Sequence, residues 1–123
     1  MIAESLAFVG NVLSAAGINY QFAEFGGTIT YPYFVGEYTE SEPLTEDGLE
    51  ESTFLLTGYS RGSWLALETA KETIKALFIN GKTAILPSGR GMAVFWSDSI
   101  PIPTQDEEIK RMEIRLSIKE WRI

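Results

Sequence analysis

The chain of 123 residues contains no histidine and no cysteine, and these absences exclude several kinds of chemistry. Without cysteine it has no disulfide and no thiolate metal ligand, which fits a reducing compartment. Without histidine it lacks the imidazole ligand favoured by zinc, copper and iron. It also lacks the usual general base of a serine hydrolase. We therefore expect no catalytic site, metal or other cofactor.

Basic residues and long apolar runs are also scarce. Ten Lys and Arg stand against 17 Asp and Glu, which gives a net charge of −7. A protein that binds nucleic acid tightly through its phosphates needs clustered basic residues, whereas the basic residues of this chain are scattered. The chain has no apolar run of about 18 residues, and its start lacks the pattern of a signal peptide. We expect neither tight nucleic-acid binding nor a membrane span.

The composition that remains is that of an ordinary globular domain. The hydrophobic fraction is 45% and the charged fraction is 22%, so a core can form without an unusual surface. We expect residues 1–123 to form a single domain, which is long enough to bury most of the surface of its unfolded chain.

The central stretch, Thr53 to Gly81, predicts a strand, a tight corner at Gly58–Ser63 and a helix that begins at Trp64. Ser63 is the expected N-cap, and Gly81 is the expected left-handed residue after the helix. Apolar residues recur at the three-and-four spacing of one buried helical stripe. They are Leu67, Ala70, Ile74, Leu77 and Phe78.

The predicted corner contains Gly58-Tyr59-Ser60-Arg61-Gly62, which matches the G-x-S-x-G nucleophile elbow of α/β-hydrolases. A serine needs a base to become nucleophilic, and the sequence offers no histidine for this role. Lysine would be the substitute, but no lysine after Ser60 sits in a recognisable partner motif; these are Lys71, Lys75, Lys82, Lys110 and Lys119. We interpret the motif as a structural turn and keep a serine hydrolase as the enzymatic alternative.

The remaining elements follow from periodicity. Met1–Ala16 is predicted to be an amphipathic helix that packs on a sheet. Tyr31–Tyr38 reads as an aromatic strand, with Gly36 at a bulge or a close backbone approach. Met92–Trp96 is a further strand, and Ser97–Glu108 is a long polar connection. The final strand is the clearest, since Met112, Ile114, Leu116 and Ile118 alternate with polar residues.

These elements predict an α+β fold with the order α-β-β-α-β-β. The expected architecture is a mainly antiparallel four-stranded sheet that carries two helices on one face.

An acidic stretch, Glu37 to Glu51, contains no Lys or Arg and is expected to be a solvated loop. A calcium site and a negatively charged surface are its functional alternatives, but the ligand spacing of an EF-hand is absent. Arg90 lies in a predicted loop, and Trp121 lies in a tail that would dock on a neighbour. The candidate interaction residues are Glu40, Glu42, Glu46, Asp47, Glu50, Glu51, Arg90 and Trp121.

The layout resembles the tail-terminator, tail-completion and tail-to-head joining proteins of long-tailed bacteriophages and prophages. The resemblance covers nearly the whole chain, and Tyr31-Pro32-Tyr33-Phe34-Val35-Gly36-Glu37 is its most specific part. It implies a non-enzymatic minor tail protein that forms a ring, often a hexamer, on the tail tube.

On this resemblance the partners are other copies of the chain, tail-tube proteins and head-connector proteins. DNA passes through the ring without specific binding, and the protein becomes a virion component assembled in the bacterial host cytoplasm. An acidic lumen would let DNA slide without sticking. A small adaptor that binds a partner by strand addition is the other non-enzymatic alternative.

Overall fold

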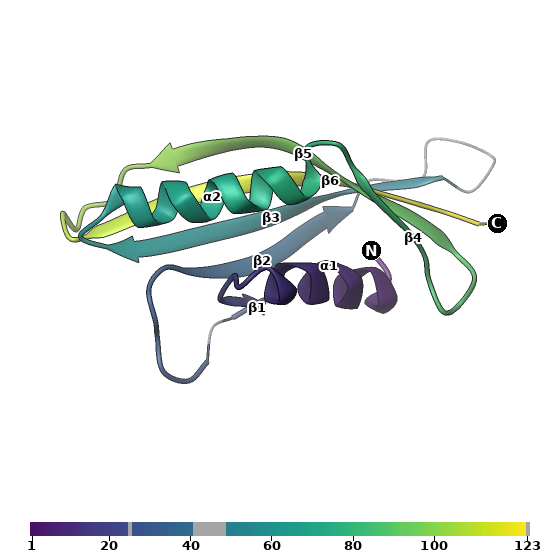
Figure 1. Ribbon diagram of the computed structural model, residues 1–123, viewed down its shortest axis with the longest axis horizontal. Helices are drawn as coiled ribbons and strands as arrows, with labels where there is room; N and C mark the ends of the chain where they lie inside the picture. Colours follow the sequence, from purple (N-terminus) through teal and green to yellow (C-terminus); the bar gives the residue numbers. More distant parts are fainter. Residues whose placement is uncertain (25, 41–48, 123) are drawn as a thin grey trace.

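The computed structural model describes residues 1–24, 26–40 and 49–122, which contain two helices and six strands. The order is α1 (Ala3–Ala15), β1 (Tyr20–Phe22), β2 (Tyr33–Glu40), β3 (Glu50–Arg61), α2 (Trp64–Phe78), β4 (Lys82–Ile85), β5 (Gly91–Ile102) and β6 (Ile109–Trp121). Both helices lie on the same side of the twisted sheet (Figure 1).

The described strands form one mixed sheet with the spatial order β1-β2-β3-β6-β5-β4. β1 pairs with β2 in parallel, and each of the other neighbouring pairs is antiparallel. β6 lies between β3 and β5, and it pairs with each of them over most of its length. The last described strand is therefore the centre of the sheet.

The core lies between the helices and one face of the sheet. Val9 and Leu13 of α1 and Leu67, Ile74 and Phe78 of α2 are fully buried. They pack with alternate residues of the long strands, since successive side chains of a strand point to opposite faces. Each large side chain that is buried in this way contributes about 1.5–3 kcal/mol to stability. We call this side the helix-covered face.

The opposite side of the sheet carries no described helix, and we call it the open face. Antiparallel register aligns its residues in rows across the strands. One row consists of Tyr33, Tyr59, Arg111 and Ile102, and another consists of Glu37, Leu55, Arg115 and Asp98. The open face is thus a mixture of aromatic, apolar and charged side chains.

The prediction of a four-stranded sheet with the order α-β-β-α-β-β is wrong. The two missed strands, β1 and β4, are only three and four residues long, so neither shows enough alternation to stand out in the sequence. β1 also runs parallel to its neighbour, which makes the sheet mixed. In addition, β5 continues through Ser97–Ile102, a part of the chain that we had assigned to a connection.

The corner expected at Gly58–Ser63 is shorter than predicted, because β3 continues through Arg61. The turn falls on Gly62, which has a φ of +76°, and its N–H donates to the Glu108 carbonyl at 2.6 Å. The Ser63 side chain accepts from Ala66 N at 3.4 Å, which confirms the predicted cap. Gly81, with a φ of +79°, confirms the predicted left-handed residue after α2.

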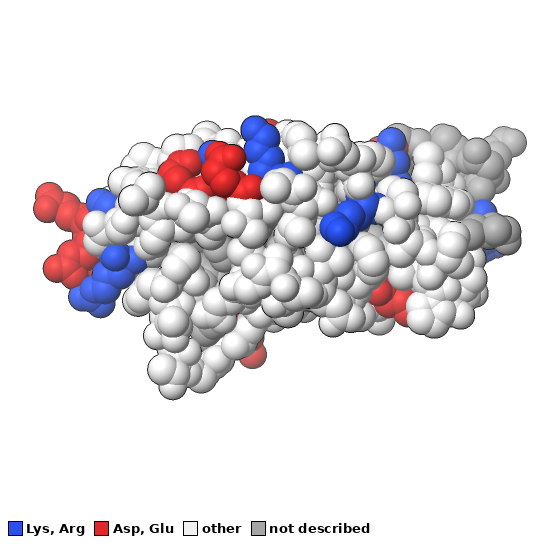
Figure 2. Space-filling view, in the orientation of Figure 1, with Lys and Arg blue, Asp and Glu red and all other residues white. Residues whose placement is uncertain are grey.

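Most of the face seen in Figure 2 is uncharged, and charged side chains gather over α2 and at one end of the molecule, with a few others scattered between. On α2, Lys71 pairs with Glu68 at 2.8 Å and with Glu72 at 2.9 Å. Within the described ranges, neither helix is long and apolar enough to cross a membrane.

Candidate functional site

Ser60, the serine of the hydrolase-like motif, lies within β3 and not at a turn. It is 2% exposed and belongs to the helix-covered face, while its neighbours Tyr59 and Arg61 belong to the open face. Its cross-strand neighbour is Lys110, whose Nζ donates to the Glu107 carbonyl at 2.8 Å. The strand-turn-helix elbow required by the motif is not formed at Ser60, so a substrate would have no access to its hydroxyl.

The described members of the predicted acidic stretch lie mainly on strands. Glu40 is the last residue of β2, and Glu50 and Glu51 are the first residues of β3. Glu42, Glu46 and Asp47 lie outside the described residues. Both ends of the loop that we predicted from Glu37 to Glu51 are therefore strand residues.

The structure brings Arg90 and Glu50 together, although they were predicted in separate loops. Arg90 lies in the β4–β5 turn, and its Nη2 is 3.8 Å from Glu50 Oε2. Trp121 is the last residue of β6 and covers Gly91, where an added Cβ would come within 2.4 Å of the indole ring. Trp121 is thus half-buried in the sheet and does not form a free tail.

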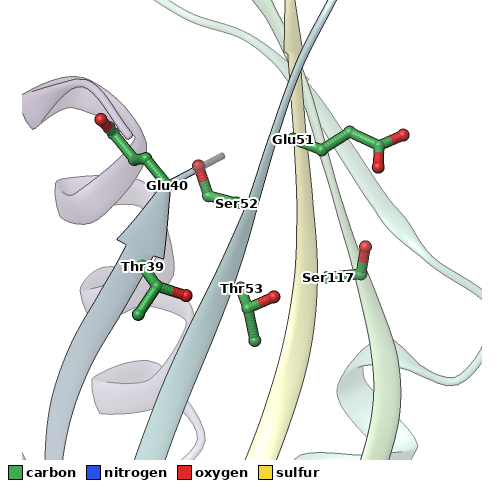
Figure 3. A pocket seen from close by; sticks show the side chains of 6 residues that line it. All are labelled: Thr39, Glu40, Glu51, Ser52, Thr53 and Ser117. Atoms are coloured by element: carbon green, nitrogen blue, oxygen red, sulfur yellow. The ribbon is translucent and has the colours of Figure 1, made fainter. Parts of the chain in front are cut away.

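A small polar hollow of about 160 Å³ contains two of the predicted residues, Glu40 and Glu51. Its other lining residues are Thr39, Ser52, Thr53 and Ser117. Figure 3 shows that Glu40 and Ser52 point to one side of the strands, while Thr39, Thr53 and Ser117 point to the other. The carboxylates do not converge, and no metal-binding cluster of acidic side chains occurs among the residues described.

A buried carboxylate that sequence reasoning missed lies beside this hollow. Glu120 is fully buried, and its Oε2 accepts from Ser5 Oγ at 2.6 Å and from Ile2 N at 3.0 Å. The N-terminal ammonium of Met1 pairs with Glu40 and lies 3.7 Å from Glu120 Oε1. This network ties the start of α1 to β2 and β6. The available signal was that Glu120 continues the buried alternation of β6.

The strongest candidate for a binding surface is a groove on the open face, which we call the tyrosine–arginine groove. It is about 390 Å³ in volume and is lined by side chains from β2, β3 and β6 and from the segment after β1. These are Ala23, Glu24, Tyr33, Val35, Glu37, Thr57, Tyr59 and Arg111. Its volume lies within the range of ordinary ligand pockets.

Aromatic stacking forms one wall of this groove. The rings of Tyr33 and Tyr59 are stacked, with centroids 5.0 Å apart and an interplanar angle of 22°. Tyr31 lies against Tyr33 with a centroid distance of 5.5 Å. Burial raises the pKa of Tyr33 above its ordinary value, and the nearby Tyr31 and Tyr59 raise it further. The hydroxyl therefore stays protonated at neutral pH.

Arg111 supplies the positive charge of the groove. Its Nε atom is buried and has no hydrogen-bond partner among the described residues. The two other arginines of the open face are paired, Arg61 with Glu108 at 2.7 Å and Arg115 with Asp98 at 2.7 Å. Sequence reasoning missed the groove, because its residues come from strands far apart in the chain and meet only through sheet register.

These features define a two-layer α+β protein in which no described helix covers one face of the sheet. No family model matches the chain, and no curated protein matches it in sequence. A protein of known structure that carries no functional description is similar over 100% of this chain and 99% of its own, with a TM-score of 0.60 and 16% identity. At that identity the similarity concerns the fold alone.

Proposed function

We propose that the protein is a non-enzymatic structural subunit that associates with copies of itself to form a ring on the tail tube of a long-tailed bacteriophage or prophage. Its tail-terminator, tail-completion or tail-to-head joining role rests on the sequence resemblance. The partners on this proposal are tail-tube and head-connector proteins, and assembly takes place in the cytoplasm of the bacterial host. DNA passes through the ring without specific binding.

The observation that carries a role in assembly is the uncovered open face with its tyrosine–arginine groove. Tyr, Trp and Arg dominate the binding energy of protein interfaces, and here Tyr31, Tyr33, Tyr59 and Arg111 gather at one end of the face. The burial of Ser60 in a strand supports a non-enzymatic role, because the catalytic alternative requires an accessible hydroxyl.

The test is the mass of the purified protein, measured by light scattering and mass photometry, alone and with isolated tail tubes. A mass equal to a small whole number of chains, with ring-shaped particles in electron micrographs, is the expected result. Association seen only with tubes also supports the proposal, because a ring of this kind can require the tail tube for its assembly. A protein that stays monomeric under both conditions contradicts it.

An adaptor that binds a partner by strand addition is the second candidate, and the edge of β5 favours it. β4 pairs with β5 only from Gly91 to Val94, so the outer edge beyond Phe95 has no strand partner among the described residues. However, β5 has a register shift between Trp96 and Asp98 and a proline at position 101, which are features that discourage edge pairing. A monomer that captures an extended peptide along β5 would favour this function over the ring.

A further inference from the structure

The tyrosine–arginine groove crosses the strands of the open face, and the register of the sheet gives its layout. Tyr33, Tyr59 and Arg111 form one row across β2, β3 and β6. Val35 and Thr57 form the next row and are the floor, because their side chains are shorter. The groove therefore has an aromatic wall beside its floor, and its positive charge lies at the β6 end.

Two acidic side chains, Glu24 and Glu37, line the other end of the groove, which is formed by β2 and the segment after β1. Both are exposed, and neither forms an ion pair with a described residue. Glu24 follows Ala23, whose φ of +68° is left-handed and costs an alanine about 1–2 kcal/mol. The Ala23 N–H donates to the Gly36 carbonyl at 2.8 Å, which holds this strained turn against β2. Backbone strain of this kind is concentrated at sites that hold a ligand, so it points to this end of the groove.

The charges at this end attract an organic cation. Because β3 separates β2 from β6, Glu37 and Arg111 stand on strands about 10 Å apart. At that distance salt largely screens the repulsion between Arg111 and a bound cation, whereas a cation in contact with the carboxylates is screened much less. A guanidinium also gains from aromatic rings, which Tyr33 and Tyr59 place on the wall.

The chain itself offers a suitable cation. Four of its ten basic residues form ion pairs with described residues, namely Arg61, Lys71, Arg90 and Arg115. Three more lie over aromatic rings, and these are Lys75, Lys110 and Lys119. Outside the groove this leaves Lys82, which is half-buried, and Arg122, which is exposed and forms no ion pair in the part of the chain that the structure describes. Arg122 is thus the available guanidinium.

Arg122 lies too far from the groove of its own chain to enter it. It comes directly after β6, whereas Arg111 lies near the start of that strand. The 11 residue steps from 111 to 122 span about 36 Å in an extended strand. Figure 1 accordingly shows the C-terminus at one end of the molecule and the turn between β5 and β6 at the other. A second copy placed end to end brings Arg122 to the groove.

We infer that Arg122 of one copy of the chain docks in the tyrosine–arginine groove of the next copy, where its guanidinium pairs with Glu37 and Glu24. The contact joins two different surfaces and is therefore heterologous. Heterologous contacts close into rings when the rotation between copies permits it. The inference rests on the proposed function, because it specifies the contact between neighbouring subunits of the ring.

The experiment is a charge exchange, followed by mass photometry and light scattering under the conditions in which the wild-type protein assembles. Arg122→Glu and Glu37→Arg are each expected to weaken self-association about 30-fold or more, because each places like charges in contact. The double variant should restore assembly, since the pair is re-formed with reversed charges. Lys75→Glu and Glu107→Arg make the same two charge changes at exposed residues outside the contact, and both should assemble normally.

Each variant is first checked for folding by far-UV circular dichroism and urea denaturation. Normal assembly of folded Arg122→Glu would overturn the inference and leave the ring standing. Loss of assembly in both single variants without rescue in the double variant would overturn the pairing of these two residues. A wild-type protein that stays monomeric with and without tail tubes would overturn both the contact and the ring. A two-fold dimer that follows the charge exchange would support the contact and overturn the ring.

Discussion

At the scale of single residues, Tyr20 connects α1, β1 and the sheet. Its ring lies 6.2 Å from that of Phe54, measured between centroids, and it occupies the space above Gly36. A Cβ at Gly36 would come within 2.6 Å of Tyr20 Cε2 and within 2.7 Å of Phe54 Cζ. The absence of a side chain at Gly36 is what admits the tyrosine ring, so the close approach at this glycine is made by aromatic side chains and not by a bulge or a second backbone.

Gly36→Ala should therefore destabilise the protein by about 1–3 kcal/mol, because the added methyl group overpacks a filled part of the core. The measurement is the free energy of unfolding in urea. Gly10→Ala is the matched control, since its Cβ would contact the same tyrosine ring at an ordinary 3.5 Å. The control should be stabilising by about 0.5–1 kcal/mol, because alanine replaces glycine inside a helix. Equal effects at both positions would contradict this account.

Tyr20 also predicts how stability changes at high pH. Burial raises its pKa to about 12, above the value of about 10 for an unfolded tyrosine. The unfolded chain therefore loses this proton first, and the folded state loses stability as the pH rises from 10 toward 12. We expect wild-type protein to lose more unfolding free energy over this range than Tyr20→Phe does. Parallel curves for the two proteins would contradict this assignment.

At the scale of elements, the start of α2 is set by the short turn that joins it to the long strand β3. Gly62 makes the turn, Ser63 caps the helix, and Lys71 forms ion pairs with Glu68 and Glu72 on the exposed side. Such surface pairs contribute little, so capping and the buried stripe decide the stability of the helix.

Ser63→Ala should cost about 0.5–1 kcal/mol of stability, at the lower end for a cap because its hydrogen bond is long at 3.4 Å. Ser63→Asp should retain most of the stability, since aspartate caps helices equally well and its charge suits a helix N-terminus. Urea denaturation followed at a helical wavelength measures both variants. A larger loss in Ser63→Asp than in Ser63→Ala would show that the side chain has another role.

The sequence predicted the elements with strong periodicity and missed those whose existence depends on tertiary contacts. Helix α2 and its cap could be read from residues 63–81, because capping and a buried stripe are local features. The pairing of Tyr20–Phe22 with β2 is not local, and a three-residue strand has no period to detect. The groove could not be predicted for the same reason, because the alignment of Tyr33, Tyr59 and Arg111 follows from the register of three strands.

At the scale of the whole molecule, the acidic side chains at the start of β3 are candidates for a lumen-facing surface. Glu50 is partly exposed and lies near Arg90, and Glu51 is exposed. Glu50→Gln combined with Glu51→Gln should change the free energy of unfolding by less than about 1 kcal/mol, because exposed ion pairs are weak. On the ring proposal, the same variant should impair phage assembly or DNA passage in a complementation assay. Full infectivity would show that the charge of Glu50 and Glu51 is not needed for phage assembly or DNA passage.

The central position of β6 has a consequence for how the protein folds while the ribosome synthesises it. Among the described strands, β6 (residues 109–121) is the one that joins β3 to β5, so the sheet remains split until that segment has been synthesised. Contacts between residues so distant in sequence make folding slow, because long loops must close before the contacts form. During translation the two unfinished halves expose strand edges, so chaperone contact should matter more at this stage than at any later one.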